Sequence, residues 1–136
     1  MSPLNRSVLV VDDEAIIAEL WCTHMMLMGI DVCGTAATAD DAVALAEAHR
    51  PAVVLMDMRL RGEKDGVDAA LAIYESVGSK VVFITGSQEP ATRSRIDLDH
   101  PAAVLIKPVS DRMLKSAVMS ALAASGHAPP GEPVGV

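Results

Sequence analysis

Polar side chains follow four short apolar runs of this chain, at the point where each run ends. They are Asp12 and Asp13 after the first run, Asp57 after the second, Thr85 after the third and Lys107 after the fourth. Neighbouring carboxylates repel one another, and a hard divalent cation such as Mg²⁺ relieves that repulsion. A cation beside a nucleophilic carboxylate, a hydroxyl group and an ammonium group can perform phosphoryl transfer. These residue types therefore predict Mg²⁺-dependent phosphoryl chemistry if the fold brings them together.

The four apolar runs are rich in β-branched residues, which is typical of strands buried on both faces. They cover residues 8–11, 53–56, 81–84 and 103–106. A further, weaker strand is predicted over residues 30–33, where the apolar run is shorter.

Amphipathic patterns lie between the runs and predict helices, each with one face turned toward the sheet. The residues expected to face inward are Ile17, Leu20, Trp21, His24 and Met28 in the first helix, Ala42, Val43 and Ala46 in the second, Val67, Ala70, Leu71 and Tyr74 in the third, and Leu114, Ala117, Val118, Ala121 and Leu122 in the last.

Capping signals mark several helix ends. Thr38 and Ser110 are predicted N-caps, and Gly29 and Gly78 are predicted to close helices. Residues 88–100 are polar and weakly periodic, so only a short, marginal helix is expected there.

Strands that alternate with helices predict an α/β fold with a five-stranded, parallel, doubly wound sheet. In such a sheet the carboxyl ends of the strands lie along one edge, where ligands bind. The polar residues that follow the runs should therefore converge at that edge.

The composition limits the class of protein. The chain has 136 residues, of which 51% are hydrophobic, and this suits one domain with a substantial core. A net charge of −7 with scattered basic residues argues against direct nucleic-acid binding. No apolar run approaches the ~18 residues of a membrane span, and the start does not resemble a signal peptide. Cys22 and Cys33 lack metal-binding spacing, so reduced, buried thiols and a cytoplasmic location are expected.

The ordered set of polar residues resembles that of the receiver domain of two-component response regulators, which has a flavodoxin-like fold. The segment MDMRLRGEKDGVDAA is similar to the family's phosphorylation loop, and FITGS and IKPVS resemble its switch and lysine segments. The matching residues are Asp12-Asp13, Asp57, Thr85 and Lys107-Pro108.

The resemblance covers nearly the whole chain. Residues 7–125 would form the receiver domain, residues 1–6 an N-terminal tail, and the Gly/Pro-rich residues 126–136 a disordered C-terminal tail.

The resemblance implies a metal site. Asp13 and Asp57 would bind Mg²⁺ directly, together with the backbone carbonyl group of Arg59, and Asp12 would act through a water molecule.

The resemblance also implies a phosphoacceptor. Asp57 would accept a phosphoryl group from a histidine kinase or a histidine phosphotransfer protein. Thr85 would bind a phosphoryl oxygen, Lys107 would pair with Asp57 and then with the phosphate, and the Lys107-Pro108 peptide bond would be cis. The phosphorylated chain would signal to an unknown downstream protein through residues 90–122, and a homodimer is compatible with this role.

This chain departs from the family's usual pattern at three places. Val104 stands where many members have an aromatic switch residue, and Arg61 stands where a proline is common. The loop before Asp65-Gly66 is also one residue longer. Near the site, the Arg59 side chain could shield the acyl phosphate, and Ser87 is expected to face the entrance.

Two other functions fit the same fold. A phosphohydrolase that uses an aspartyl phosphate needs a second acid two residues after the nucleophile, and Arg59 occupies that position. A scaffold that binds partners without phosphorylation would not need the acidic set. The sequence favours the phosphoacceptor over both.

Overall fold

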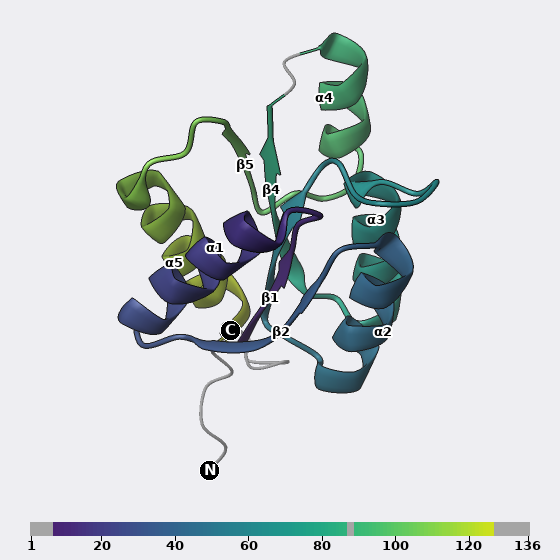
Figure 1. Ribbon diagram of the computed structural model, residues 1–136. Coiled ribbons are helices and arrows are strands. Elements are labelled where there is room, and N and C mark those ends of the chain that lie inside the picture. The colour runs from purple at the N-terminus through teal and green to yellow at the C-terminus, as the bar shows by residue number, and fades with distance from the viewer. Residues whose placement is uncertain (1–6, 87–88, 127–136) are drawn as a thin grey trace, which may run out of the picture.

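A computed structural model describes residues 7–86 and 89–126. Its strands form one parallel sheet with the order β2-β1-β3-β4-β5 (Figure 1). They are β1 (Ser7–Val11), β2 (Asp31–Ala36), β3 (Val53–Asp57), β4 (Lys80–Thr85) and β5 (Ala103–Ile106). The predicted five-stranded, doubly wound fold is confirmed.

Helices cover both faces of this sheet. Figure 1 shows α1 and α5 on one face and α2 and α3 on the other, with α4 beyond α3. The helices are α1 (Ala15–Leu27), α2 (Ala39–His49), α3 (Gly66–Ser76), α4 (Pro90–Asp97) and α5 (Asp111–Gly126). The strand order reverses between β1 and β3, and ligands bind at such a switch point in sheets of this kind.

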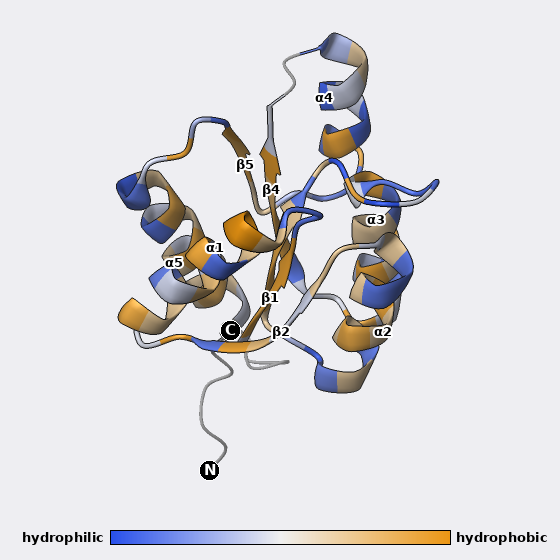
Figure 2. Cartoon of the chain, viewed as in Figure 1, coloured by the Kyte–Doolittle hydropathy of each residue, from blue (hydrophilic) through white to orange (hydrophobic). Residues whose placement is uncertain are grey.

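The sheet separates two hydrophobic clusters because neighbouring strand residues point to opposite faces. In β1, Leu9 packs toward α2 and α3, whereas Val10 packs toward α1 and α5. Figure 2 shows the hydrophobic strands between helices that carry many polar residues, although α1 also shows hydrophobic segments and exposes Ile16 and Leu27. Side chains of β1 and β3 are buried throughout both strands except at Ser7, which explains why their sequences are continuously apolar.

The weakest strand prediction was too short. β2 extends to Ala36, and most of its side chains are half-buried or exposed because it lies at the edge of the sheet. An edge strand needs fewer apolar residues, so its sequence signal ends early.

Two predicted helix faces were partly wrong. In α1 the buried residues are Ala18, Trp21 and Met25, whereas Leu20 is 49% exposed. In α3, Ile73 is buried and Tyr74 is 42% exposed. Small alanines take inward positions in both helices, so the largest apolar residues did not mark the inward face correctly. The faces predicted for α2 and α5 lie inward as expected.

The predicted caps and short fourth helix are confirmed. Thr38 Oγ1 accepts the Asp41 N–H group at 3.1 Å, and Ser110 Oγ accepts that of Met113 at 3.2 Å. α4 begins at Pro90. The predicted tails lie outside the described residues, except that α5 continues through Gly126.

The prediction of buried cysteine thiols was wrong in part. The thiols of Cys22 and Cys33 are free but only half-buried. A contact between helices also involves a residue of the predicted inward face: His24 Nε2 lies 3.2 Å from Asp111 Oδ1 and links α1 to α5.

Candidate functional site

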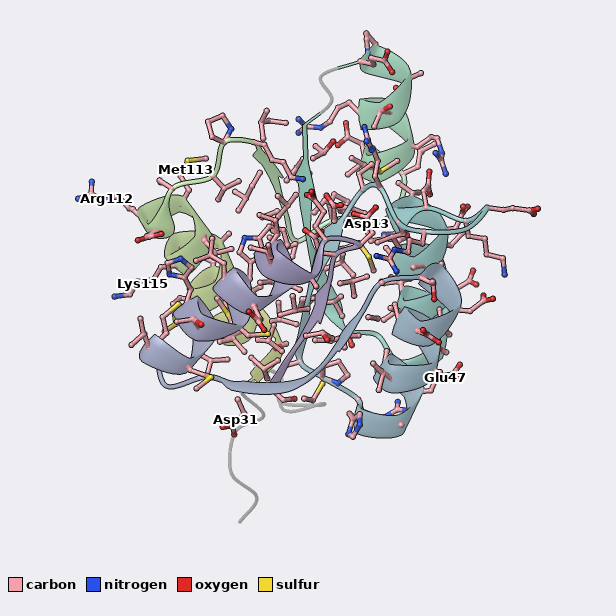
Figure 3. The ribbon with its side chains drawn as sticks, in the orientation of Figure 1. Asp13, Asp31, Glu47, Arg112, Met113 and Lys115 are labelled. Atoms are coloured by element: carbon pink, nitrogen blue, oxygen red, sulfur yellow. The ribbon has the colours of Figure 1, made fainter. Side chains whose placement is uncertain are left out.

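The polar residues that follow β1 and β5, and those that end β3 and β4, meet at the carboxyl edge of the sheet. Asp57 is paired with Ile84, the residue before Thr85, and Thr85 is paired with Ile106, the residue before Lys107. This register places the three polar side chains beside one another around a cavity of about 950 Å³. Figure 3 shows Asp13 at this edge and Asp31, at the start of β2, near the opposite edge.

Three carboxylates form the centre of the site. Asp12, Asp13 and Asp57 each offer an oxygen atom, and these atoms lie within 4.8 Å of one another. Asp12 and Asp57 are buried, with 3% and 4% of their surface exposed, whereas Asp13 is half-buried and lines the cavity. The predicted clustering of the three acids is therefore present in the structure.

Burial and mutual repulsion make these carboxylates unfavourable when they are ionised together. Burial raises the pKa of Asp12 to about 6, and the charge of Asp57 adds to the rise, although the Glu14 N–H group opposes it by donating to Asp12 Oδ1 at 2.8 Å. Asp12 Oδ2 is buried and has no hydrogen-bond partner within the described part of the chain.

This set of donors fits a hard divalent cation. All three groups are carboxylates, and one buried oxygen atom is unsatisfied. Mg²⁺ prefers oxygen ligands and would offset the repulsion between the charges. Arg59 lines the cavity two residues after Asp57 and has an exposed side chain.

Lys107 supplies the cationic partner of Asp57. Its Nζ donates to Asp57 Oδ1 at 3.1 Å, and its backbone N–H donates to the Thr85 carbonyl oxygen at 2.9 Å. The Lys107-Pro108 peptide bond is cis, as predicted. Burial raises the pKa of Asp57, and the hydrogen bond from Lys107 limits that rise.

Thr85 ends β4 beside the acidic cluster, and Gly86 follows it. Thr85 is only 2% exposed, and both residues line the cavity. A Cβ atom at Gly86 would lie 3.9 Å from Lys107 Cδ, so glycine leaves the space next to the lysine open. Ser87, which was expected at the entrance, lies outside the described residues.

The structure adds residues that sequence analysis missed. Asp65, Thr92 and Arg95 line the same cavity, the last two from α4. The spacing of Asp65 and Asp68 is that of a capping box and could have indicated an N-cap. Nothing local in the sequence indicated that Arg95 would reach an acid 30 residues away.

Comparison with known proteins agrees with this geometry. The family profile of the response regulator receiver domain matches residues 8–119. The chain belongs to this family. Receiver domains are signalling domains, they interact with kinases or phosphotransfer proteins, and they typically bind Mg²⁺ through acidic residues such as those clustered here.

Two curated regulatory proteins are similar in sequence to this receiver domain. The transcriptional regulatory protein PdtaR of Mycobacterium tuberculosis is 32% identical over 105 residues, which cover 77% of this chain and 51% of PdtaR. The phyllosphere-induced regulator PhyR of Methylorubrum extorquens is 28% identical over 120 residues, which cover 88% of this chain and 44% of PhyR. The chain thus spans about half the length of these relatives.

Solved receiver domains have the same fold. The receiver domain of a modulated diguanylate cyclase from Desulfovibrio desulfuricans superposes with a TM-score of 0.82 at 30% identity, covering 88% of this chain and 94% of that one. The receiver domain of NarL from Mycobacterium tuberculosis gives 0.81 at 28% identity, covering 89% and 98%. None of the helices that the structure describes is long and apolar enough to cross a membrane.

Proposed function

We propose that this receiver domain accepts a phosphoryl group on Asp57 from a histidine kinase or a histidine phosphotransfer protein and signals through a changed surface. The observation that carries the proposal is the environment of Asp57. Its buried carboxylate ends β3 beside two other acids and accepts a hydrogen bond from Lys107 at 3.1 Å.

Asp57 would act as the nucleophile. Its carboxylate oxygen would attack the phosphorus atom of the donor's phosphohistidine, so that a P–O bond forms while the P–N bond breaks. The donor imidazole leaves with the electron pair of the broken bond and takes up a proton. Lys107 favours the ionised, nucleophilic form of Asp57 against the effect of burial.

The neighbouring residues would stabilise the transferred group. The Thr85 hydroxyl group would donate to a phosphoryl oxygen, and Lys107 would move from Asp57 to the phosphate. Gly86 leaves room for the group.

Asp13, Asp57 and the backbone carbonyl group of Arg59 would hold Mg²⁺ directly, and Asp12 would do so through a water molecule. When bound, the cation would neutralise negative charge on the phosphoryl oxygens.

The changed surface would consist of α4, β5 and α5, roughly residues 90–122. Every residue of β5 is half-buried, and Leu98 after α4 is 81% exposed. A partner that binds there would sense a shift of α4, and phosphorylation would favour one of two pre-existing arrangements.

Labelling by a small phosphodonor tests this function. Acetyl phosphate with Mg²⁺ should label the wild-type chain, and removal of the metal with EDTA should prevent labelling. Asp57→Asn should abolish the label because an amide cannot form the acyl phosphate. Labelling that survives this substitution would overturn the assignment. Two further measurements test the alternatives. If a partner binds equally well with and without the phosphodonor, the chain is a phosphorylation-independent scaffold. Turnover of phosphate esters would indicate a phosphohydrolase.

A further inference from the structure

α4 is the helix least anchored in the core. Ile96 is its buried residue, and most of its other side chains are exposed. The helix stands beyond α3 (Figure 1) and lines the cavity with Thr92 and Arg95. An element with so little buried apolar surface can shift at low cost, so its polar contacts decide where it lies.

Arg95 makes the main polar contact between α4 and the rest of the domain. Its Nη1 donates to Asp65 Oδ2 at 2.7 Å, and its Nη2 donates to Asp65 Oδ1 at 3.2 Å. Nη2 also lies 3.6 Å from Asp68 Oδ1. Two parallel bonds between a guanidinium group and a carboxylate fix orientation as well as distance.

Asp65 is itself held rigidly by α3. Its Oδ1 accepts the N–H groups of Val67 at 3.0 Å and Asp68 at 3.1 Å, and its own N–H donates to Asp68 Oδ2 at 3.0 Å. Burial raises the pKa of Asp65, but hydrogen bonds from Arg95 and from the Asp68 backbone outweigh this and lower it below its usual value. The carboxylate that Arg95 grips is thus the N-cap of α3.

The next residue packs against the phosphoacceptor. Gly66 N–H donates to the Met58 carbonyl oxygen at 2.8 Å, and a Cβ atom at Gly66 would overlap the Asp57 carbonyl oxygen. The same Cβ atom would lie 3.1 Å from Met56 Cγ. The first residue of α3 therefore lies directly on the backbone of Asp57.

These contacts form a continuous chain from α4 to the backbone of Asp57. We propose that Arg95 is the residue through which a phosphoryl group on Asp57 and the position of α4 influence each other, by way of Asp65 and Gly66. This inference rests on the proposed function. The contact of Arg95 would carry the effect of phosphorylation to α4 in a domain that has Val104 where many receivers have an aromatic switch residue.

Hydrogen exchange of α4 tests the coupling. The probe is beryllium fluoride with Mg²⁺, which mimics an acyl phosphate, and ¹⁹F NMR verifies that every sample is saturated. In the wild-type chain, the probe should change deuterium uptake in peptides covering Pro90–Asp97 by about 5-fold or more, as expected for a typical coupling between two sites. In Arg95→Ala the change should fall below about 2-fold, and Arg95→Lys should restore part of it because a charge remains.

A matched control lies on the same helix. Arg93 pairs with Asp97 inside α4 at 3.0 Å and does not line the cavity, so Arg93→Ala should respond as the wild type does. Asp65→Asn tests the other side of the contact without changing any residue of α4. Asparagine keeps an oxygen atom that can cap α3, but it loses the charge that pairs with Arg95. This variant decides the matter if alanine at position 95 unfolds α4.

Each outcome has a distinct meaning. A full α4 response in Asp65→Asn or in a folded Arg95→Ala would overturn the role of Arg95, whereas the proposed function would stand. Failure of the wild-type chain to bind the probe at all would count against the proposed function itself.

Discussion

Asp12 and Asp13 are adjacent in sequence but occupy different environments. Asp12 is 3% exposed and bonded to the Glu14 backbone, whereas Asp13 is half-buried and lines the cavity. The sequence predicted that both acids belong to the site. The different roles predicted for them, Asp13 as a direct metal ligand and Asp12 as one that acts through water, came from the resemblance to the receiver family and not from their spacing.

We predict that Asp13→Ala weakens Mg²⁺ binding more than Asp12→Ala does. Loss of an outer-shell partner costs about 10–100-fold in affinity, and loss of a direct ligand should cost more. Isothermal titration calorimetry with MgCl₂ measures both variants. The reverse order would show that the roles of the two aspartates have been exchanged.

A single added methyl group at Gly66 should destabilise the fold. Gly66→Ala places a methyl group against the Asp57 carbonyl oxygen, and overpacking of this kind costs about 1–3 kcal/mol in the free energy of unfolding. Urea denaturation measures the loss. Gly34→Ala in β2 is the matched control, because its new Cβ atom would meet Leu45 at an ordinary 3.5 Å. Equal effects of the two substitutions would refute the close packing at Asp57.

At the scale of elements, the continuously apolar strands were predictable because both faces of a central parallel strand are buried. The edge strand β2 and the inward faces of α1 and α3 were predicted less well. In the two helices, small residues such as Ala18 and Ala69 pack inward, whereas the larger side chains of Leu20 and Tyr74, which were expected to mark the inward face, are exposed. The position of α4 depends on Arg95 and Asp65, which are distant in sequence, so no local pattern encodes it.

A pH-sensitive group lies just after α4. Asp99 is 4% exposed, and neither carboxylate oxygen has a hydrogen-bond partner among the residues described. Burial raises the pKa of Asp99 from the ordinary value of 3.8 to about 6. The positive charges of His100 and Arg95 oppose this rise, and the negative charges of Glu75 and Asp68 add to it. Because the pKa is higher in the folded state, the ionised group destabilises the fold above pH 6, and this penalty disappears as the pH falls toward 4.

Asp99→Asn should therefore raise the free energy of unfolding at pH 7.5 by about 1–3 kcal/mol, because the amide removes the buried charge whose ionisation the raised pKa shows to be unfavourable in the folded state. The difference from wild type should shrink as the pH is lowered toward 4. Urea denaturation across this range measures both values. A difference that stays constant with pH would contradict a titrating Asp99.

At the scale of the whole molecule, alternating strands and helices predicted the sheet, and the sheet predicted where the polar residues meet. Asp57, Thr85 and Lys107 come together because β3, β4 and β5 are parallel neighbours in register. This part of the site could be predicted because it follows from topology. The places of Thr92 and Arg95 of α4 in the site could not be predicted, because they depend on side-chain contacts across the cavity.

The central claim is that Asp57 becomes an acyl phosphate, and mapping the modified residue tests it most directly. The chain is treated with acetyl phosphate and Mg²⁺, reduced with borohydride, which converts an aspartyl phosphate to homoserine, and analysed by peptide mass spectrometry. We predict homoserine at position 57 only, with none formed in EDTA. Homoserine at position 12 or 13, or unmodified aspartate at position 57, would contradict the account.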